Sequence, residues 1–176
     1  MLQDIAETDW ILAPRCRPML DALQRHGIAF EFLGTPRHLS TALELARRHP
    51  ELTLILDHGL KPEIAKAAFD DWAAGMTELA ALPQVVCKLS GLVTEAGPDW
   101  SLSRIERYVR HIVDAFGPAR VMWGSDWPVV DLAGGYDAWR AATLALLDSR
   151  TEAPAILGVT TARVYRIADM TADMSA

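Results

Sequence analysis

Ionisable side chains stand at or near the ends of three apolar segments. His58 closes LTLILDH (52–58), Lys88 interrupts VVCKLSG (85–91), and Asp126 follows the apolar start of VMWGSDWPVV (121–130). Gly124 and Pro128 break the last segment on either side of Asp126. A carboxylate or an imidazole can transfer protons, and an imidazole or an ammonium can stabilise negative charge. Asp126 and His58 are therefore the candidate catalytic residues, and Lys88 is a candidate for contact with a substrate.

Each of these residues also has an ordinary structural interpretation. An aspartate after a strand often bonds loop amides or caps the next segment, and His58 could be a core histidine with its hydrogen bonds satisfied. An ammonium in an apolar strand needs a partner, so Lys88 fits a buried ion pair as well as a site. We expect Asp57 to orient backbone or a neighbouring helix rather than to act on a substrate.

Two further residues are candidates for substrate binding. Trp127 adjoins Asp126 and could contact a substrate or only pack, and Arg37 could hold an anionic substrate. No motif for another chemistry competes, because GxGxxG, GxxxxGK[ST] and GxSxG are all missing from the sequence. The five histidines include no HxH or HExxH pair, so the sequence alone displays no strong metal site.

The elements that must position these residues alternate along the chain. Short apolar runs predict strands, and apolar residues at helical spacing follow each of them. Such βα units form a parallel sheet, which keeps its chemistry at the carboxyl ends of its strands. We predict one α/β domain over residues 1–167 and a flexible tail over 168–176. The predicted strands are 29–34, 52–58, 85–91 and 121–126, and the predicted helices are 16–26, 39–49, 62–81, 101–116, 136–148 and 160–167.

Composition limits the class of protein. The 176 residues are 51% hydrophobic and 23% charged, as in ordinary globular domains. A formal net charge of -6 without a Lys/Arg cluster argues against a nucleic-acid partner. No apolar run approaches the roughly 18 residues that cross a bilayer, so we expect no membrane partner and a cytoplasmic protein. Cys16 and Cys87 cannot form a disulfide scaffold, and Cys87 is expected to be a buried free thiol.

Three motifs, in this order, carry a resemblance to a known family. LILDHGLKP, VVCKLSGL and VMWGSDWPV resemble motifs of the amidohydrolase-related proteins, in the branch of the sugar-lactone and pyrone-dicarboxylate lactonases. The resemblance extends from about residue 2 to residue 167. It implies a (β/α)8 TIM-barrel fold and a hydrolase that opens a small-molecule lactone.

The resemblance also implies roles for individual residues. Asp126 matches the general base that activates water, and His58 matches the histidine that holds the substrate carbonyl or a metal. Lys88 matches a lysine that faces the substrate. Some members of the family use one divalent metal such as zinc and others use none, so a metal is expected, if at all, at His58 and Asp126.

The chain departs from the family pattern in two ways. The family usually reads D-H-x-G-K-P, whereas here the glycine is Gly59 and Leu60 takes the usual glycine position, so the loop after His58 is expected to be reshaped. The family also begins with a strand carrying an H-x-H pair, which this sequence lacks. Such barrels need roughly 250 residues, and this chain has 176. We therefore expect an incomplete barrel, about strands 5 to 8 with the end of strand 4.

An incomplete barrel has two predictable consequences. The strands starting at 29 and 121 would be open edges, and the apolar side chains of the barrel interior would be exposed to water. Self-association is therefore expected. The alternative to an enzyme is a non-catalytic partial barrel that self-associates or complements a separate N-terminal partner.

Overall fold

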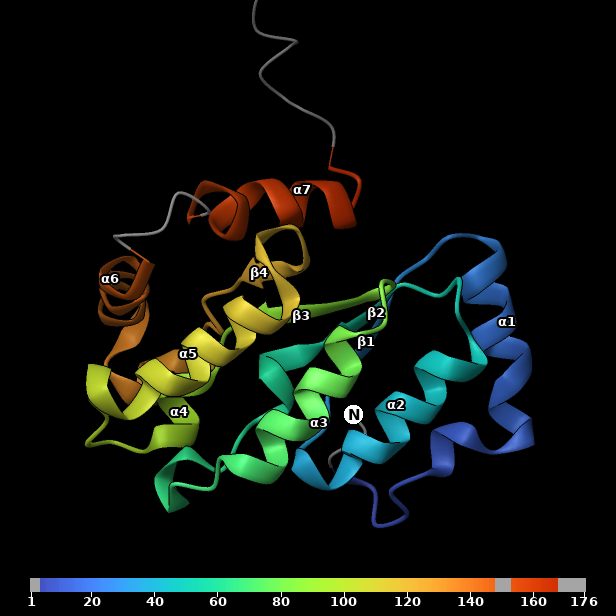
Figure 1. The fold of residues 1–176 in the computed structure, drawn as a ribbon, viewed down its shortest axis with the longest axis horizontal. Coiled ribbons are helices and arrows are strands. Elements are labelled where there is room, and N and C mark those ends of the chain that lie inside the picture. The colour runs from blue at the N-terminus through green and yellow to red at the C-terminus, as the bar shows by residue number, and fades with distance from the viewer. Residues whose placement is uncertain (1–3, 148–152, 168–176) are drawn as a thin grey trace, which may run out of the picture.

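The structure, a computed structural model, describes residues 4–147 and 153–167. Helices alternate with four short strands along the chain, and Figure 1 shows their arrangement. The predicted tail, 168–176, lies outside the described residues. The main elements are α1 (Arg17–Arg25), β1 (Phe30–Phe32), α2 (Leu39–Arg48), β2 (Leu54–Leu56), α3 (Asp70–Ala80), β3 (Val85–Leu89), α4 (Leu92–Ala96), α5 (Leu102–Phe116), β4 (Val121–Trp123), α6 (Gly135–Leu147) and α7 (Thr160–Val164).

The four strands form one parallel sheet in the order β1-β2-β3-β4. Its register pairs Phe32 with Leu56, Leu56 with Cys87, and Leu89 with Trp123. This confirms the predicted α/β class and all four predicted strands. Each strand is shorter than its predicted segment. The strands β1 and β2 begin one and two residues later than predicted, and the polar and glycine residues that follow β2, β3 and β4 lie in turns and loops.

The predicted helix over 62–81 is wrong as a single helix. A short 3-10 turn spans Ile64–Lys66, and α3 begins only at Asp70. Ala67, between them, has a φ of 54°, a left-handed conformation that an α-helix does not contain. The apolar spacing across 62–81 continued through this break, so periodicity alone could not locate it.

The sheet has two differently covered faces. The outer face packs against α2, α3 and α5 and carries the main core, which includes Leu54, Cys87 and Val121. The inner face, defined here by Ile55, Val86 and Met122, carries a second, small cluster. Figure 1 shows α7 on the side of the strands opposite to α2 and α3.

Helix α7 corrects one expectation from the sequence. The side chains of the inner face were expected to be exposed to water, but Ile55, Val86 and Met122 are buried. Val164 of α7 and Ala29 pack against them and exclude solvent. The outer strands of the sheet are β1 and β4, as expected, so the prediction of two edges holds for the described residues.

Both cysteines are free and buried, as predicted for Cys87. Burial raises the pKa of the Cys87 thiol, which makes it a poor nucleophile. Within residues 4–147 and 153–167, no helix has the length and apolar character to cross a membrane.

Candidate active site

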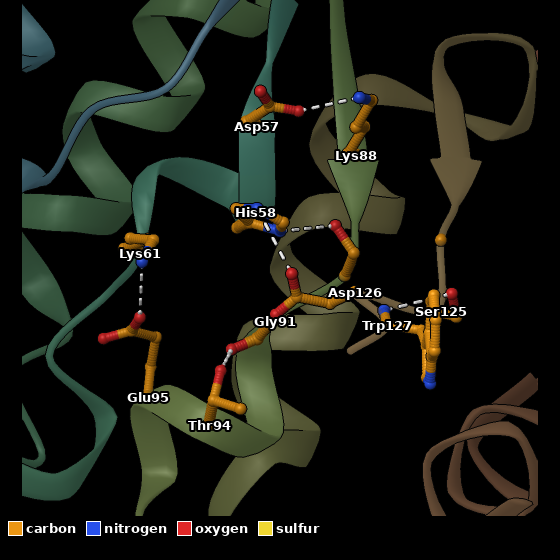
Figure 2. Close-up of polar contacts among 12 residues, drawn as sticks. Asp57, His58, Lys61, Lys88, Gly91, Thr94, Glu95, Ser125, Asp126 and Trp127 are labelled. Atoms are coloured by element: carbon orange, nitrogen blue, oxygen red, sulfur yellow. Dashed lines mark hydrogen bonds and ion pairs between the residues drawn. The ribbon is translucent and has the colours of Figure 1, made fainter. Parts of the chain in front are cut away.

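His58 and Asp126 meet beyond the carboxyl ends of the strands. His58 follows β2 and Asp126 follows β4, yet Nε2 of His58 lies 3.6 Å from Oδ1 of Asp126 (Figure 2). Both side chains are largely buried, with 18% and 13% of their surface exposed. Because parallel strands end at one edge of the sheet, residues 68 positions apart in the sequence become neighbours. The structure thus brings the two predicted catalytic residues together.

A left-handed turn presents His58 to this site. Four consecutive residues have a positive φ: His58 at 51°, Gly59 at 54°, Leu60 at 58° and Lys61 at 49°. Residues other than glycine pay roughly 1–2 kcal/mol each for this conformation, so the turn needs outside support. Trp72 supplies part of it, since its Nε1 donates to the Gly59 carbonyl oxygen at 2.8 Å.

Further contacts hold the same turn. The backbone N–H of Lys61 donates to the His58 carbonyl oxygen at 2.9 Å, and Nζ of Lys61 pairs with Oε1 of Glu95 at 3.4 Å. Leu60, where the family pattern usually has glycine, is fully buried and adopts a conformation that favours glycine. Strain of this kind concentrates at functional sites, where the surrounding structure maintains it.

Asp126 also occupies a left-handed conformation, with a φ of 61°. Aspartate tolerates this region better than most residues. Burial raises the pKa of its carboxyl group; the positive charges of His58 and Lys61 act against this, and the negative charge of Asp57 adds to it. A carboxylate with a raised pKa is a stronger base, which suits proton transfer near neutral pH.

Ser90 is a site residue that the sequence analysis did not select. Its side chain is buried, and its Oγ lies 2.8 Å from Nδ1 of His58. Gly91, with a φ of 68°, leaves room for the imidazole, because a Cβ there would lie 2.9 Å from the ring. The position of Ser90 at the carboxyl end of β3, between the ends that carry His58 and Asp126, was the signal that could have identified it.

Lys88 takes part in an ion-pair network on the inner side of the strands. Nζ lies 2.8 Å from Oδ1 of Asp57 and 2.9 Å from Oε2 of Glu31, and the ammonium stands 5.9 Å from the centre of the Tyr165 ring. The Tyr165 hydroxyl donates to Oε1 of Glu31. Burial alone would lower the pKa of Lys88, but the hydrogen bonds and charge of Asp57 and Glu31 outweigh it and raise the pKa.

This network changes two interpretations from the sequence. Lys88 has its ion pair, the structural alternative that was left open, and its contact with a substrate remains a prediction. Asp57 was expected to orient backbone or a helix, but its carboxylate instead binds the Lys88 ammonium. The reason is the neighbouring strand, which places Lys88 beside the end of β2 (Figure 2).

The two other predicted binding residues lie at different places. Trp127 is 70% exposed beside Asp126, so it does not serve only to pack the core. Its backbone N–H donates to Oγ of Ser125. Arg37 follows β1, is exposed, and donates to the backbone carbonyl oxygen of Ile5 at 2.8 Å.

The donor set for a metal is small. His58 and Asp126 could supply two ligands to one cation, whereas zinc sites use at least three protein ligands. No three His, Cys, Asp or Glu side chains among the described residues are grouped so as to hold a metal ion. The described residues therefore do not make a complete zinc site.

Parallel βα units with ionisable groups beyond the carboxyl ends of the strands define a class of fold. The chain is an α/β protein that corresponds to part of a (β/α)8 barrel. Its structural match to a solved barrel protein covers 94% of this chain but only 62% of the solved protein. The chain belongs to the amidohydrolase family, whose model matches residues 2–167. This confirms the family and the lactonase branch inferred from the three motifs.

Relatives with known structures or curated names define the similarity further. The solved protein is an amidohydrolase from Burkholderia multivorans with bound zinc, 40% identical to this chain with a TM-score of 0.89. An L-fucono-1,5-lactonase from Burkholderia ambifaria is 53% identical over 144 residues, which cover 80% of this chain and 50% of that protein. Another, from Burkholderia multivorans, is 42% identical over 160 residues, 82% of this chain and 53% of that protein. The chain therefore spans about half the length of the curated relatives it matches.

Proposed function

We propose that this chain carries the general-base half of a lactonase site and hydrolyses a sugar lactone such as L-fucono-1,5-lactone. The observation that supports this most directly is the approach of His58 Nε2 to Asp126 Oδ1 at 3.6 Å. Two relatives named L-fucono-1,5-lactonase supply the substrate class. They also favour the enzyme over the non-catalytic alternative.

Asp126 acts on the attacking water. Its carboxylate takes a proton as the water oxygen forms a bond to the ring carbonyl carbon, and the carbonyl oxygen becomes an alkoxide. The ring C–O bond then breaks, and the proton held by Asp126 passes to the leaving alkoxide. The product is an open-chain hydroxy acid, and a positioned base of this kind contributes roughly 10²–10⁴-fold.

His58 acts on the developing negative charge. Its Nε2 faces Oδ1 of Asp126 (Figure 2), and a substrate carbonyl bound beside both atoms would receive from Nε2 a hydrogen bond that stabilises the alkoxide of the tetrahedral intermediate. Lys88 and Trp127 are also proposed to contact the substrate, and Arg37 is proposed to bind an anionic group of it. No step is assigned to a metal, because the described donors supply only two ligands.

The purified chain tests the proposal with a panel of sugar lactones and a pH-indicator assay of acid release. Hydrolysis of L-fucono-1,5-lactone by the chain, lost in Asp126→Asn, is the expected result. Light scattering during size exclusion measures the proposed self-association in the same preparation. A folded chain that hydrolyses no lactone of the panel contradicts the proposal.

A further inference from the structure

Among the described residues, Ser90 is the hydrogen-bond partner of Nδ1 of His58, the ring nitrogen that does not face Asp126. Its Oγ and Nδ1 of His58 are 2.8 Å apart, a normal hydrogen-bond distance. No other hydrogen-bond partner of Ser90 Oγ occurs among residues 4–147 and 153–167. The hydroxyl hydrogen of this buried residue therefore has Nδ1 as its acceptor within the described structure.

The two sides of the imidazole select the same tautomer. A neutral imidazole carries one N–H and one bare nitrogen. If Nδ1 were protonated, the Ser90 hydroxyl hydrogen would lose its acceptor, and the bare Nε2 would face the Asp126 carboxylate. With Nε2 protonated, Ser90 donates to Nδ1 and the Nε2 hydrogen points towards the negative charge.

We propose that Ser90 is a positioning residue that holds His58 in the tautomer protonated at Nε2 and aims that N–H at the space beside Asp126. The catalytic consequence of this inference rests on the proposed function, since only the protonated Nε2 can stabilise an alkoxide. The tautomer itself is inferred from the hydrogen bond and does not depend on the proposed function.

Two glycines fix the position of Ser90 and of the ring. A Cβ at Gly91 would lie 2.9 Å from Cγ and Nδ1 of His58, so the ring packs directly on this backbone. A Cβ at Gly124 would lie 3.3 Å from Cβ of Ser90, and the Gly124 N–H donates to the Leu89 carbonyl oxygen at 3.1 Å. The ends of β3 and β4 thus enclose the serine and leave its hydroxyl little freedom.

Nitrogen-15 NMR tests the tautomer directly. Two-bond proton–nitrogen spectra at about pH 8, above the ordinary histidine pKa of about 6.5, distinguish a protonated ring nitrogen from a bare one. His58→Gln identifies the His58 signals among the five histidines. We expect one tautomer, protonated at Nε2, in the unchanged chain. In Ser90→Ala, where only Asp126 still favours that tautomer, we expect a measurable fraction protonated at Nδ1.

Ser125→Ala is the matched control. It removes a hydroxyl from the same site, but this hydroxyl accepts a hydrogen bond from the Trp127 backbone N–H and does not bond to His58. It should leave the His58 tautomer unchanged. Ser90→Cys, which fills the space with a weaker donor, repeats the test if Ser90→Ala fails to fold. A His58 protonated at Nδ1, or an identical tautomer in the Ser90 variants, overturns the proposal.

Kinetics separate this proposal from the proposed function. Loss of an orienting partner typically lowers activity roughly 10- to 100-fold, and we expect this fall in kcat with a smaller change in KM for Ser90→Ala. If the chain hydrolyses no lactone while the tautomer depends on Ser90, only the proposed function fails. If lactone turnover is intact in a folded Ser90→Ala variant, the positioning role fails.

Discussion

Replacing Asp126 by asparagine tests the central residue of the site with little change in shape. Asparagine tolerates the φ of 61° as aspartate does, so the loop after β4 should keep its conformation. The change removes the proton acceptor, and turnover should fall by roughly 10²–10⁴-fold, which corresponds to about 3 to 5 kcal/mol in the activation barrier. The assay is acid release from L-fucono-1,5-lactone at saturating substrate.

Thermal unfolding of the same variant distinguishes a lost base from a lost fold. The pKa of Asp126 is raised in the folded protein, so its contribution to stability is present at low pH and is lost as the pH rises through the folded pKa. Asparagine cannot ionise, so the variant does not lose this stability as the pH rises. At pH 7 the variant should therefore melt at the same temperature as the unchanged chain or higher, and the difference should shrink as the pH falls below about 4.

Two results would refute this reasoning. Unchanged turnover in a folded variant would show that Asp126 is not the base. A variant that melts well below the unchanged chain at pH 7 would show that Asp126 stabilises the loop as an ionised group, contrary to the direction of its pKa shift.

Four further changes have expected outcomes. His58→Ala should lower kcat by roughly 10²–10³-fold, and a loss of stability with full activity would identify it as a core histidine. Gly91→Ala and Gly117→Ala should each cost roughly 1–3 kcal/mol in unfolding free energy, because Gly91 (φ 68°, ψ -1°) and Gly117 (φ 70°, ψ 163°) both adopt conformations that other residues rarely take. Only Gly91→Ala should lower activity, because its Cβ would lie 2.9 Å from the His58 ring, whereas no atom lies within 4 Å of the added Cβ at Gly117. Lys88→Met should destabilise the fold by up to about 3 kcal/mol in denaturant unfolding by leaving a buried carboxylate unpaired, whereas Lys66→Met, at an exposed pair, should cost less than about 1 kcal/mol. A metal chelator should leave the rate of lactone hydrolysis unchanged. If the chelator abolishes hydrolysis and added zinc restores it, the protein has metal ligands beyond His58 and Asp126.

The order of elements was predictable because burial leaves a clear pattern in the sequence. Strands covered on both faces are continuously apolar, as in Leu54–Leu56, and helices such as α5 repeat apolar residues on one face. The break at Ala67 was not predictable, because alanine favours helices and its left-handed conformation is set by its surroundings. The covering of the inner face by α7 was not predictable either, since it depends on a helix far along the chain.

By itself the sequence determined the parallel sheet, the family, and which residue types stand at the carboxyl ends of the strands. Only the tertiary structure decided which of those residues act together. It placed His58 beside Asp126 and Ser90, and it paired the Lys88 ammonium with the carboxylates of Asp57 and Glu31. The physical reason is that alternation along a strand determines which face of the sheet a side chain lies on. Which side chains meet across neighbouring strands depends instead on the strand register and on left-handed turns, and the residue types alone do not specify these.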